Sequence, residues 1–113
     1  MKIGFIGFGK VAKNLTGLID SENITFLTSA QNRSENTIEN MKKSDVEILD
    51  TFKEVAAFSD ILISANSPSQ ALDIAAEYGK YSKGIYIDLN NISPKTTLKI
   101  NEYVDNFVDG AII

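Results

Sequence analysis

The sequence contains no cysteine, no histidine and no tryptophan, and only two prolines. Without cysteine the chain has no disulfide, no thiolate nucleophile and no zinc site built on thiolates. Without histidine it lacks the usual general base and the commonest metal ligand, so proton transfer would fall to lysine, tyrosine or a carboxylate. These absences narrow the chemistry that the chain can perform by itself.

Charge of one sign and long apolar runs are also scarce. The 11 basic and 15 acidic residues are scattered and give a net charge of −4, so no basic field exists to attract nucleic acid or anionic lipid. No segment approaches the roughly 18 to 20 apolar residues that span a bilayer, and no signal-peptide pattern opens the chain. We expect a cytoplasmic domain with a small-molecule partner, no nucleic acid and no membrane.

What is present indicates one ordinary globular domain. The 113 residues are 43% apolar and 23% charged, which is close to the average for soluble proteins. Apolar segments with the character of buried strands alternate with segments of helical period from end to end. Strands are predicted over residues 3–6, 24–28, 46–48, 61–65, 85–89 and 107–113. The pattern predicts an α/β fold, a doubly wound parallel sheet of the Rossmann type with six strands.

Capping residues mark where the predicted helices begin and end. Thr51 and Glu54 have the spacing of a capping box, which predicts a helix from there to residue 58. Gly79 is expected to end another helix as its C-terminal cap. Two helices are predicted to begin at Ser-Pro pairs, Ser67-Pro68 and Ser93-Pro94. The last helix is expected to turn inward an apolar face of three residues, Leu98, Tyr103 and Val104.

A glycine-rich turn follows the first strand. Residues 7–12 read G-x-G-x-x-A, placed between a strand and a helix as a dinucleotide-binding fingerprint requires. Gly7 would allow the tight turn, Gly9 the close approach of the pyrophosphate, and Ala12 the packing of helix on strand. The alternative is a turn with no ligand. Cofactor contacts are predicted at five residues, Gly7, Phe8, Gly9, Lys10 and Val11.

The end of the second strand indicates which dinucleotide binds. NAD-binding domains usually place an acid about 20 residues after the fingerprint, where it binds the ribose hydroxyls. Residues 27–34 contain no acid, whereas Arg33 could pair with a 2′-phosphate and Asn32 and Ser34 could add hydrogen bonds. Arg33 could instead be a solvated loop cation. The pattern favours NADP as the cofactor.

Polar residues also follow the fourth and fifth predicted strands. Ala65, Asn66 and Ser67 are expected to touch the cofactor, because ligands of such sheets lie at the carboxyl ends of the strands. Their alternative role is an ordinary helix cap. Asn90 and Asn91 could hydrogen-bond the nicotinamide or a substrate carboxylate, or form an Asx turn into the next helix.

Taken together, the segments 3–9, 32–34, 88–94 and 107–111 resemble the N-terminal domain of the β-hydroxyacid dehydrogenases. This family contains the 3-hydroxyisobutyrate and 6-phosphogluconate dehydrogenases, and the resemblance extends over essentially the whole chain. It implies that Asn32, Arg33 and Ser34 bind the 2′-phosphate. Pyrroline-carboxylate reductases begin similarly but differ after the fifth strand, and imine reductases share the scaffold.

The resemblance also implies what this chain does not supply. In the family an Asp-x-Ser-Thr pattern follows the fifth strand, and its serine helps to hold the substrate carboxylate. Asn90 stands at that position here, so the substrate class stays open. The catalytic lysine of the family lies in a following helical domain, which also supplies much of the homodimer interface. We therefore expect residues 1–113 to be an NAD(P)-binding domain that lacks the catalytic residue, with a monomer plausible for the fragment and a homodimer for the full-length form.

The sequence thus predicts the NADP-binding domain of an oxidoreductase that transfers hydride between the nicotinamide and a small hydroxy acid or related substrate. The competing hypothesis is a regulatory module that senses NADP without turnover. A methyltransferase is disfavoured, because it too normally needs an acid at the end of the second strand. The apolar ending at residues 107–113 is expected to be a cut through a longer polypeptide.

Overall fold

The computed structural model describes residues 1–7, 13–14, 16, 23–31, 35–43, 46–65, 69–90 and 92–109. From β2 onward its elements alternate between strand and helix. The six strands are β1 (Lys2–Ile6), β2 (Thr25–Ser29), β3 (Glu47–Leu49), β4 (Ile61–Ser64), β5 (Ile85–Asp88) and β6 (Phe107–Asp109). The helices are α2 (Glu35–Lys43), α3 (Phe52–Phe58), α4 (Ala71–Tyr78) and α5 (Pro94–Ile100), with a 3-10 turn η1 (Gly79–Tyr81) after α4.

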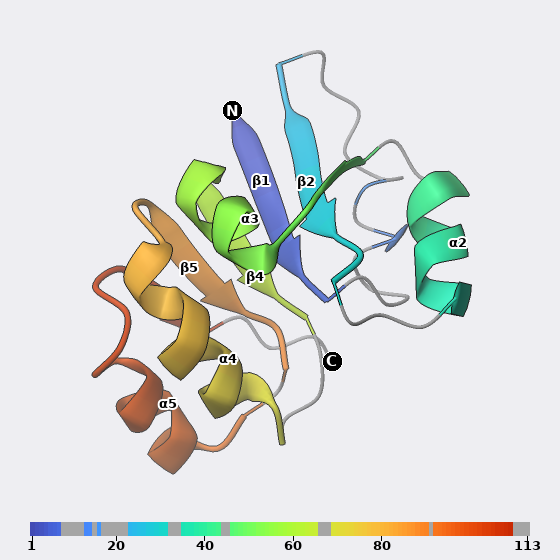
Figure 1. Cartoon of the computed structure of the whole chain (residues 1–113). Coiled ribbons are helices and arrows are strands. Elements are labelled where there is room, and N and C mark those ends of the chain that lie inside the picture. Colours follow the sequence, from blue (N-terminus) through green and yellow to red (C-terminus); the bar gives the residue numbers. More distant parts are fainter. Residues whose placement is uncertain are drawn as a thin grey trace.

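All six strands form one parallel sheet in the order β3-β2-β1-β4-β5-β6. Parallel neighbours need crossover connections, which the helices supply. The strand order reverses between β1 and β4, and all carboxyl ends lie on one edge, where the arrowheads lie in Figure 1. The predicted doubly wound Rossmann sheet is therefore confirmed, with β3 and β6 as its edge strands.

The two faces of the sheet are covered by different helices. On one face α3, α4 and α5 pack over side chains such as Leu27, Leu62 and Tyr86. On the other face Met41 of α2 packs against a separate group that includes Phe5 and Phe26. The two phenylalanine rings are stacked with their centroids 6.0 Å apart. Alternating strand residues thus enter two separate cores, as a sheet buried on both faces requires.

Local capping explains where two helices begin. The Thr51 side chain accepts a hydrogen bond from the Glu54 N–H at 3.2 Å, and its hydroxyl donates to the Glu54 carboxylate at 3.1 Å. The predicted capping box is confirmed. At α5 the Ser93 hydroxyl accepts from the Thr96 N–H at 3.2 Å, and Pro94 occupies the first turn, also as predicted.

Two expectations about the helices are wrong. In the first, helix α4 begins at Ala71, after a turn at residues 69–70, and not at the Ser67-Pro68 pair. The predicted end of this helix is confirmed, because α4 ends at Tyr78 with Gly79 as its C-terminal cap, in right-handed helical angles that lead into η1. The smallness of Gly79 also serves packing, because a Cβ there would lie 2.7 Å from the Val104 side chain.

The second error concerns the apolar face of α5. Val104 is buried as predicted, but the helix ends at Ile100, and the side chains of Leu98 and Tyr103 are 70% and 47% exposed. Ile100 is buried in their place. A helical period continued through residues 101–104 selected two wrong side chains, since the chain at residues 101–103 forms turns.

Candidate functional site

The glycine turn lies where the strand order reverses. Gly7 directly follows β1, is buried and has a φ of 90°, a region that side chains other than glycine rarely adopt. On the neighbouring strand, the Ala65 N–H donates to the Ile6 carbonyl at 3.2 Å, so Ala65 extends the β1–β4 pairing one residue beyond β4. The ends of β1 and β4 thus present backbone at the point where ligands of such sheets bind.

The end of β2 is held to its neighbours by side chains. The Thr28 hydroxyl donates to the Phe5 carbonyl at 3.0 Å, and the Ser29 hydroxyl accepts from the Gln31 N–H at 3.1 Å. The Gln31 side-chain oxygen accepts from the Phe52 N–H at 3.0 Å and so ties the end of β2 to the start of α3. These bonds fix the backbone from which the next three residues, predicted to bind a 2′-phosphate, emerge.

A buried polar cluster joins the ends of β4 and β5. Its members are Ser64, Asp88 and Asn90, with 0%, 0% and 5% of their surfaces exposed. The Asp88 carboxylate accepts from the Asn90 N–H at 2.7 Å and from the Asn90 side-chain amide at 3.2 Å. The same amide donates to the Ser64 hydroxyl at 3.0 Å, and the Leu89 N–H donates to the Ser64 carbonyl at 3.0 Å. Both loops that leave this edge of the sheet are therefore anchored to each other.

Tyr86 lies one layer below this cluster on the same face of the sheet. Its side chain is fully buried, and its ring lies 6.0 Å from that of Phe107. Burial raises the pKa of Tyr86 well above its ordinary value, the nearby Ser64 hydroxyl lowers it, and the negative charge of Asp88 raises it again. The Ser64 hydroxyl is close without completing a hydrogen bond of good geometry, so the phenol oxygen has no partner. Tyr86 is therefore a neutral core residue and a poor proton donor or acceptor.

The predicted site residues divide into those that the structure describes and those that it does not. Gly7, Ala65 and Asn90 lie at the carboxyl edge of β1, β4 and β5 respectively, on the three central neighbouring strands. Asn90 has its side-chain amide turned toward Ser64 and Asp88. The Asx-type bond at this place is made by Asp88, whose carboxylate accepts from the Asn90 N–H, and not by the side chain of Asn90 as the alternative expectation had it. The other predicted residues lie outside the described residues: Phe8, Gly9, Lys10, Val11, Asn32, Arg33, Ser34, Asn66, Ser67 and Asn91.

Ser64 was not predicted as a site residue, and Asp88 was named only as the first residue of the segment 88–94. The available signal was a polar residue at the last position of two buried apolar strands that neighbour each other in the predicted sheet. Within the described part of the chain, no group of three or more histidine, cysteine, aspartate or glutamate side chains could hold a metal ion. Nor is any helix among those residues long and apolar enough to cross a membrane.

The parallel order, the positive-φ glycine after β1 and the polar edge of β4 and β5 define the class of protein. It is a Rossmann domain of the oxidoreductase type that binds NAD(P). The family model described as "NADP oxidoreductase coenzyme F420-dependent" matches residues 2–92, and the chain belongs to that family. The resemblance to the β-hydroxyacid dehydrogenases is also confirmed by the structural comparisons below.

Individual relatives support this assignment. An uncharacterised 28.5 kDa protein of Methanothermus fervidus is 48% identical over 115 residues, which cover 100% of this chain and 45% of that protein. A solved conserved protein of unknown function, described as structurally similar to 3-hydroxyacid dehydrogenases, is 34% identical to this chain with a TM-score of 0.86. The match covers 96% of this chain and 42% of that protein. The 3-hydroxyisobutyrate dehydrogenase of Mycobacterium tuberculosis shares the fold at 14% identity and a TM-score of 0.74, over 99% of this chain and 40% of its own. The chain spans less than half the length of these relatives.

Proposed function

We propose that this chain is the NADP-binding part of an oxidoreductase that moves hydride between the nicotinamide and a small hydroxy acid or related substrate. The observation that carries the proposal is Gly7, whose positive φ turns the chain where β1 and β4 meet. Such a tight turn would bring the backbone at Gly9, the expected point of close approach, to a pyrophosphate. The description of the family to which the chain belongs also names an NADP-linked oxidoreductase.

NADP is the proposed dinucleotide because the end of β2 offers no carboxylate. Residues 27–34 contain only neutral side chains and Arg33. An acid at this position would repel a 2′-phosphate, whereas a guanidinium can pair with it through two hydrogen bonds. We assign the 2′-phosphate to Arg33 with Asn32 and Ser34, and the family description, which names NADP, supports this choice.

The edge formed by β4 and β5 is proposed to receive the rest of the cofactor and the substrate. Residues 65–67 would contact the dinucleotide, and Asn90 and Asn91 would lie near the nicotinamide or the substrate carboxylate. Because the Asn90 amide is bonded to Ser64 and Asp88, its backbone position is fixed before any ligand arrives. Preorganised contacts of this kind orient a cofactor, while the cofactor supplies the redox chemistry.

The remaining parts of the reaction are proposed to come from outside residues 1–113. The relatives are more than twice as long as this chain, which is consistent with an additional helical domain that carries an acid/base lysine. We propose that the full-length protein forms a homodimer through that domain. The present chain would then bind and orient NADP, and the lysine would exchange a proton with the substrate as hydride moves.

The preference for NADPH is the direct test. In a fluorescence titration the protein is expected to bind NADPH at least about tenfold more tightly than NADH, since each charge-assisted hydrogen bond contributes roughly 1.5 to 3 kcal/mol. Arg33→Ala should abolish the preference while leaving the affinity for NADH unchanged. Lys99→Ala, which removes a cation from α5, serves as the control and should keep it. Equal affinities of the wild-type protein for both dinucleotides would contradict the assignment to Arg33.

The alternative function is a module that senses NADP without turnover. Both functions predict the same binding preference, so only an assay of the full-length protein separates them. Formation of NADPH with a panel of small hydroxy acids, or its oxidation by coenzyme F420, would establish an oxidoreductase. Tight binding of NADPH with no turnover in either assay would favour the sensor.

A further inference from the structure

An open pocket lies between α3, α4 and η1, beside the end of β2. Its volume is about 450 Å³, which is within the roughly 300 to 1,000 Å³ of small-molecule sites. We call it the α3–α4 pocket. Its lining includes Gln31, Lys53, Glu77, Tyr78, Lys80 and Tyr81. Apart from Gln31, none of these residues belongs to the functional site described above.

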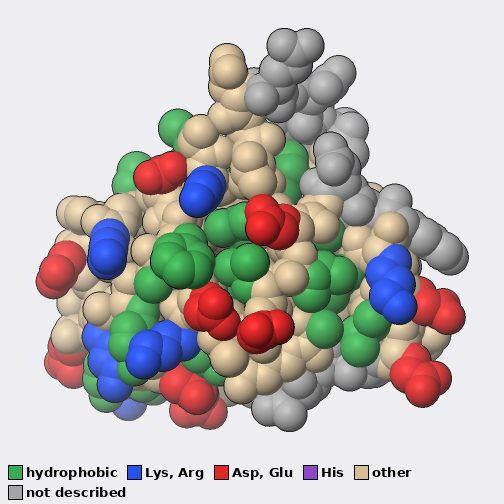
Figure 2. Space-filling model, turned by 45° about the horizontal axis from the view of Figure 1, so that its top comes forward, with side chains coloured by type: hydrophobic (Ala, Val, Ile, Leu, Met, Phe, Trp, Pro, Cys, Tyr) green, Lys and Arg blue, Asp and Glu red, His purple; other side chains and the backbone are tan. Residues whose placement is uncertain are grey.

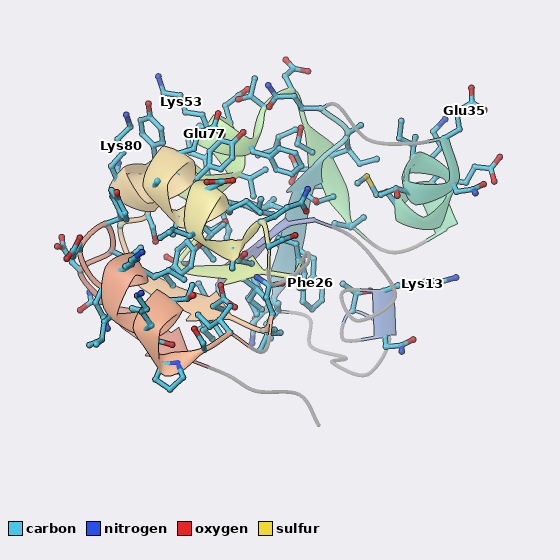
Figure 3. All side chains as sticks on the ribbon, turned by 90° about the horizontal axis from the view of Figure 1, so that it is seen from below. Lys13, Phe26, Glu35, Lys53, Glu77 and Lys80 are labelled. Carbon is cyan, nitrogen blue, oxygen red and sulfur yellow. The ribbon has the colours of Figure 1, made fainter. Side chains whose placement is uncertain are left out.

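Two lysines converge on one aromatic ring in this pocket. The Lys53 Nζ lies 5.1 Å and the Lys80 Nζ 5.2 Å from the centre of the Tyr81 ring. The electron-rich face of a tyrosine ring attracts such cations and so holds both ammonium groups at the pocket. Figure 3 shows Lys53 and Lys80 at the same corner of the molecule, far from Lys13 and Glu35.

The two positive charges are not neutralised by an ion pair. Among the residues that the structure describes, no carboxylate lies within ion-pair distance of either ammonium group. Glu77 also lines the pocket, so its charged side chains sum to two positive and one negative. On the face of the molecule shown in Figure 2, acidic and basic side chains both lie beside apolar side chains. In a chain with a net charge of −4, a local excess of positive charge favours an anion at this place.

The pocket also borders the end of β2. Gln31 lines it while its side-chain oxygen accepts from the Phe52 N–H, so the pocket wall and the start of α3 are tied together. Gln31 is two residues from Arg33 in the chain. On the other wall, the rings of Phe52 and Tyr78 meet edge to face at 6.0 Å, which gives the pocket a rigid aromatic side.

We propose that the α3–α4 pocket binds a phosphate group through Lys53 and Lys80. The phosphate can come from two sources. One is the 2′-phosphate of the NADP held at the neighbouring site, which the two lysines would then contact together with Arg33, and this arm rests on the proposed function. The other is a free phosphorylated small molecule that binds independently of the dinucleotide. In both cases Tyr81 positions the two ammonium groups.

The test removes both charges without removing side-chain length. The double variant Lys53→Gln/Lys80→Gln is compared with Lys42→Gln/Lys99→Gln, which changes the net charge equally at exposed positions on α2 and α5. Each protein, in its full-length form, is titrated with inorganic pyrophosphate, NADPH and NADH by calorimetry. Loss of the two cations should weaken phosphate binding by at least about tenfold, and the control pair should change it little.

Which of the three ligands binds more weakly to the double variant identifies the source of the phosphate. Weaker binding of NADPH with unchanged binding of NADH assigns the 2′-phosphate to the pocket. Weaker binding of pyrophosphate alone assigns a free phosphorylated ligand. If the double variant binds both pyrophosphate and NADPH as tightly as the control pair does, the proposal is overturned. A wild-type protein that binds neither dinucleotide would refute the proposed function instead, and the pyrophosphate titration would still decide the pocket.

Discussion

Burial decides the roles of the polar residues at the edge of β4 and β5. The sequence predicted that Asp88 and Asn90 are polar residues at the end of an apolar strand. It did not predict which residues they hydrogen-bond. The pairing of Ser64 with Asn90 spans 26 positions and depends on β4 and β5 lying side by side. The sequence left open whether Asn90 forms an Asx turn or meets a ligand. In the structure the Asx-type bond belongs to the Asp88 carboxylate, and the Asn90 amide donates two internal bonds. A buried amide must satisfy its hydrogen bonds inside the protein, so these contacts follow from the fold.

Tyr86 predicts a dependence of stability on alkaline pH. Burial raises the pKa of Tyr86 above its ordinary value of about 10, so the folded protein keeps a proton that the unfolded chain releases. The free energy of unfolding should therefore fall as the pH rises above about 10, by up to about 1.4 kcal/mol per pH unit for this one group. Tyr86→Phe should lose that part of the slope, as measured by urea unfolding at several pH values.

Two comparisons keep this prediction specific. At neutral pH, Tyr86→Phe should change stability by no more than about 1 kcal/mol, because the hydroxyl it removes has no hydrogen-bond partner. Tyr103→Phe alters a tyrosine that is 47% exposed and should leave the alkaline slope intact. A slope that is the same in the wild type and in Tyr86→Phe would show that the proton is released equally in both states.

At the scale of elements, the sequence predicted the kinds and order of the helices and strands better than their ends. Capping pairs at Thr51 and Ser93 located two helix starts, because a cap is a local hydrogen bond between near neighbours. The end of α5 was missed, since the burial of Ile100 depends on the distant core that it enters. Gly79 was predicted as the end of a helix, but its role in packing was missed for the same reason: its neighbour in space is Val104.

The contact of α3 with β1 predicts an effect of Gly4. A Cβ at Gly4 would collide with the Ser59 hydroxyl and lie 2.8 Å from the Val55 side chain, so α3 sits on bare backbone. Gly4→Ala should lower the free energy of unfolding by about 1 to 3 kcal/mol, the usual cost of overpacking a core. In a Ser59→Ala background the same substitution should cost less, because the colliding oxygen is gone. Ser82→Ala is the matched control, and an equal cost of Gly4→Ala in all three backgrounds would place the strain elsewhere.

At the scale of the whole molecule, the strand order is what makes the site. The alternation of strands and helices predicted a parallel sheet, and right-handed crossovers reduced the possible orders to the one observed. That order brings Gly7, Ala65 and Asn90 to adjacent strands although they lie far apart in the chain. The α3–α4 pocket could not be predicted in this way. Its lysines meet at Tyr81 only because α3 and η1 pack together, and no local pattern encodes that contact.

Binding of the dinucleotide across this edge predicts a gain in the stability of the whole domain. A ligand that binds only the folded state adds about 2.7 kcal/mol at 100 times its Kd, and each kcal/mol raises the Tm of a domain of this size by roughly 4 to 8 °C. NADPH at that concentration should therefore raise the Tm by about 10 °C or more in thermal unfolding. NADH at the same concentration, bound about tenfold more weakly, should raise it by roughly 6 to 11 °C less, because tenfold in affinity is about 1.4 kcal/mol. Equal shifts would mean that the 2′-phosphate makes no contact with the folded protein, and both Arg33 and the α3–α4 pocket would then lose their assigned roles toward the cofactor.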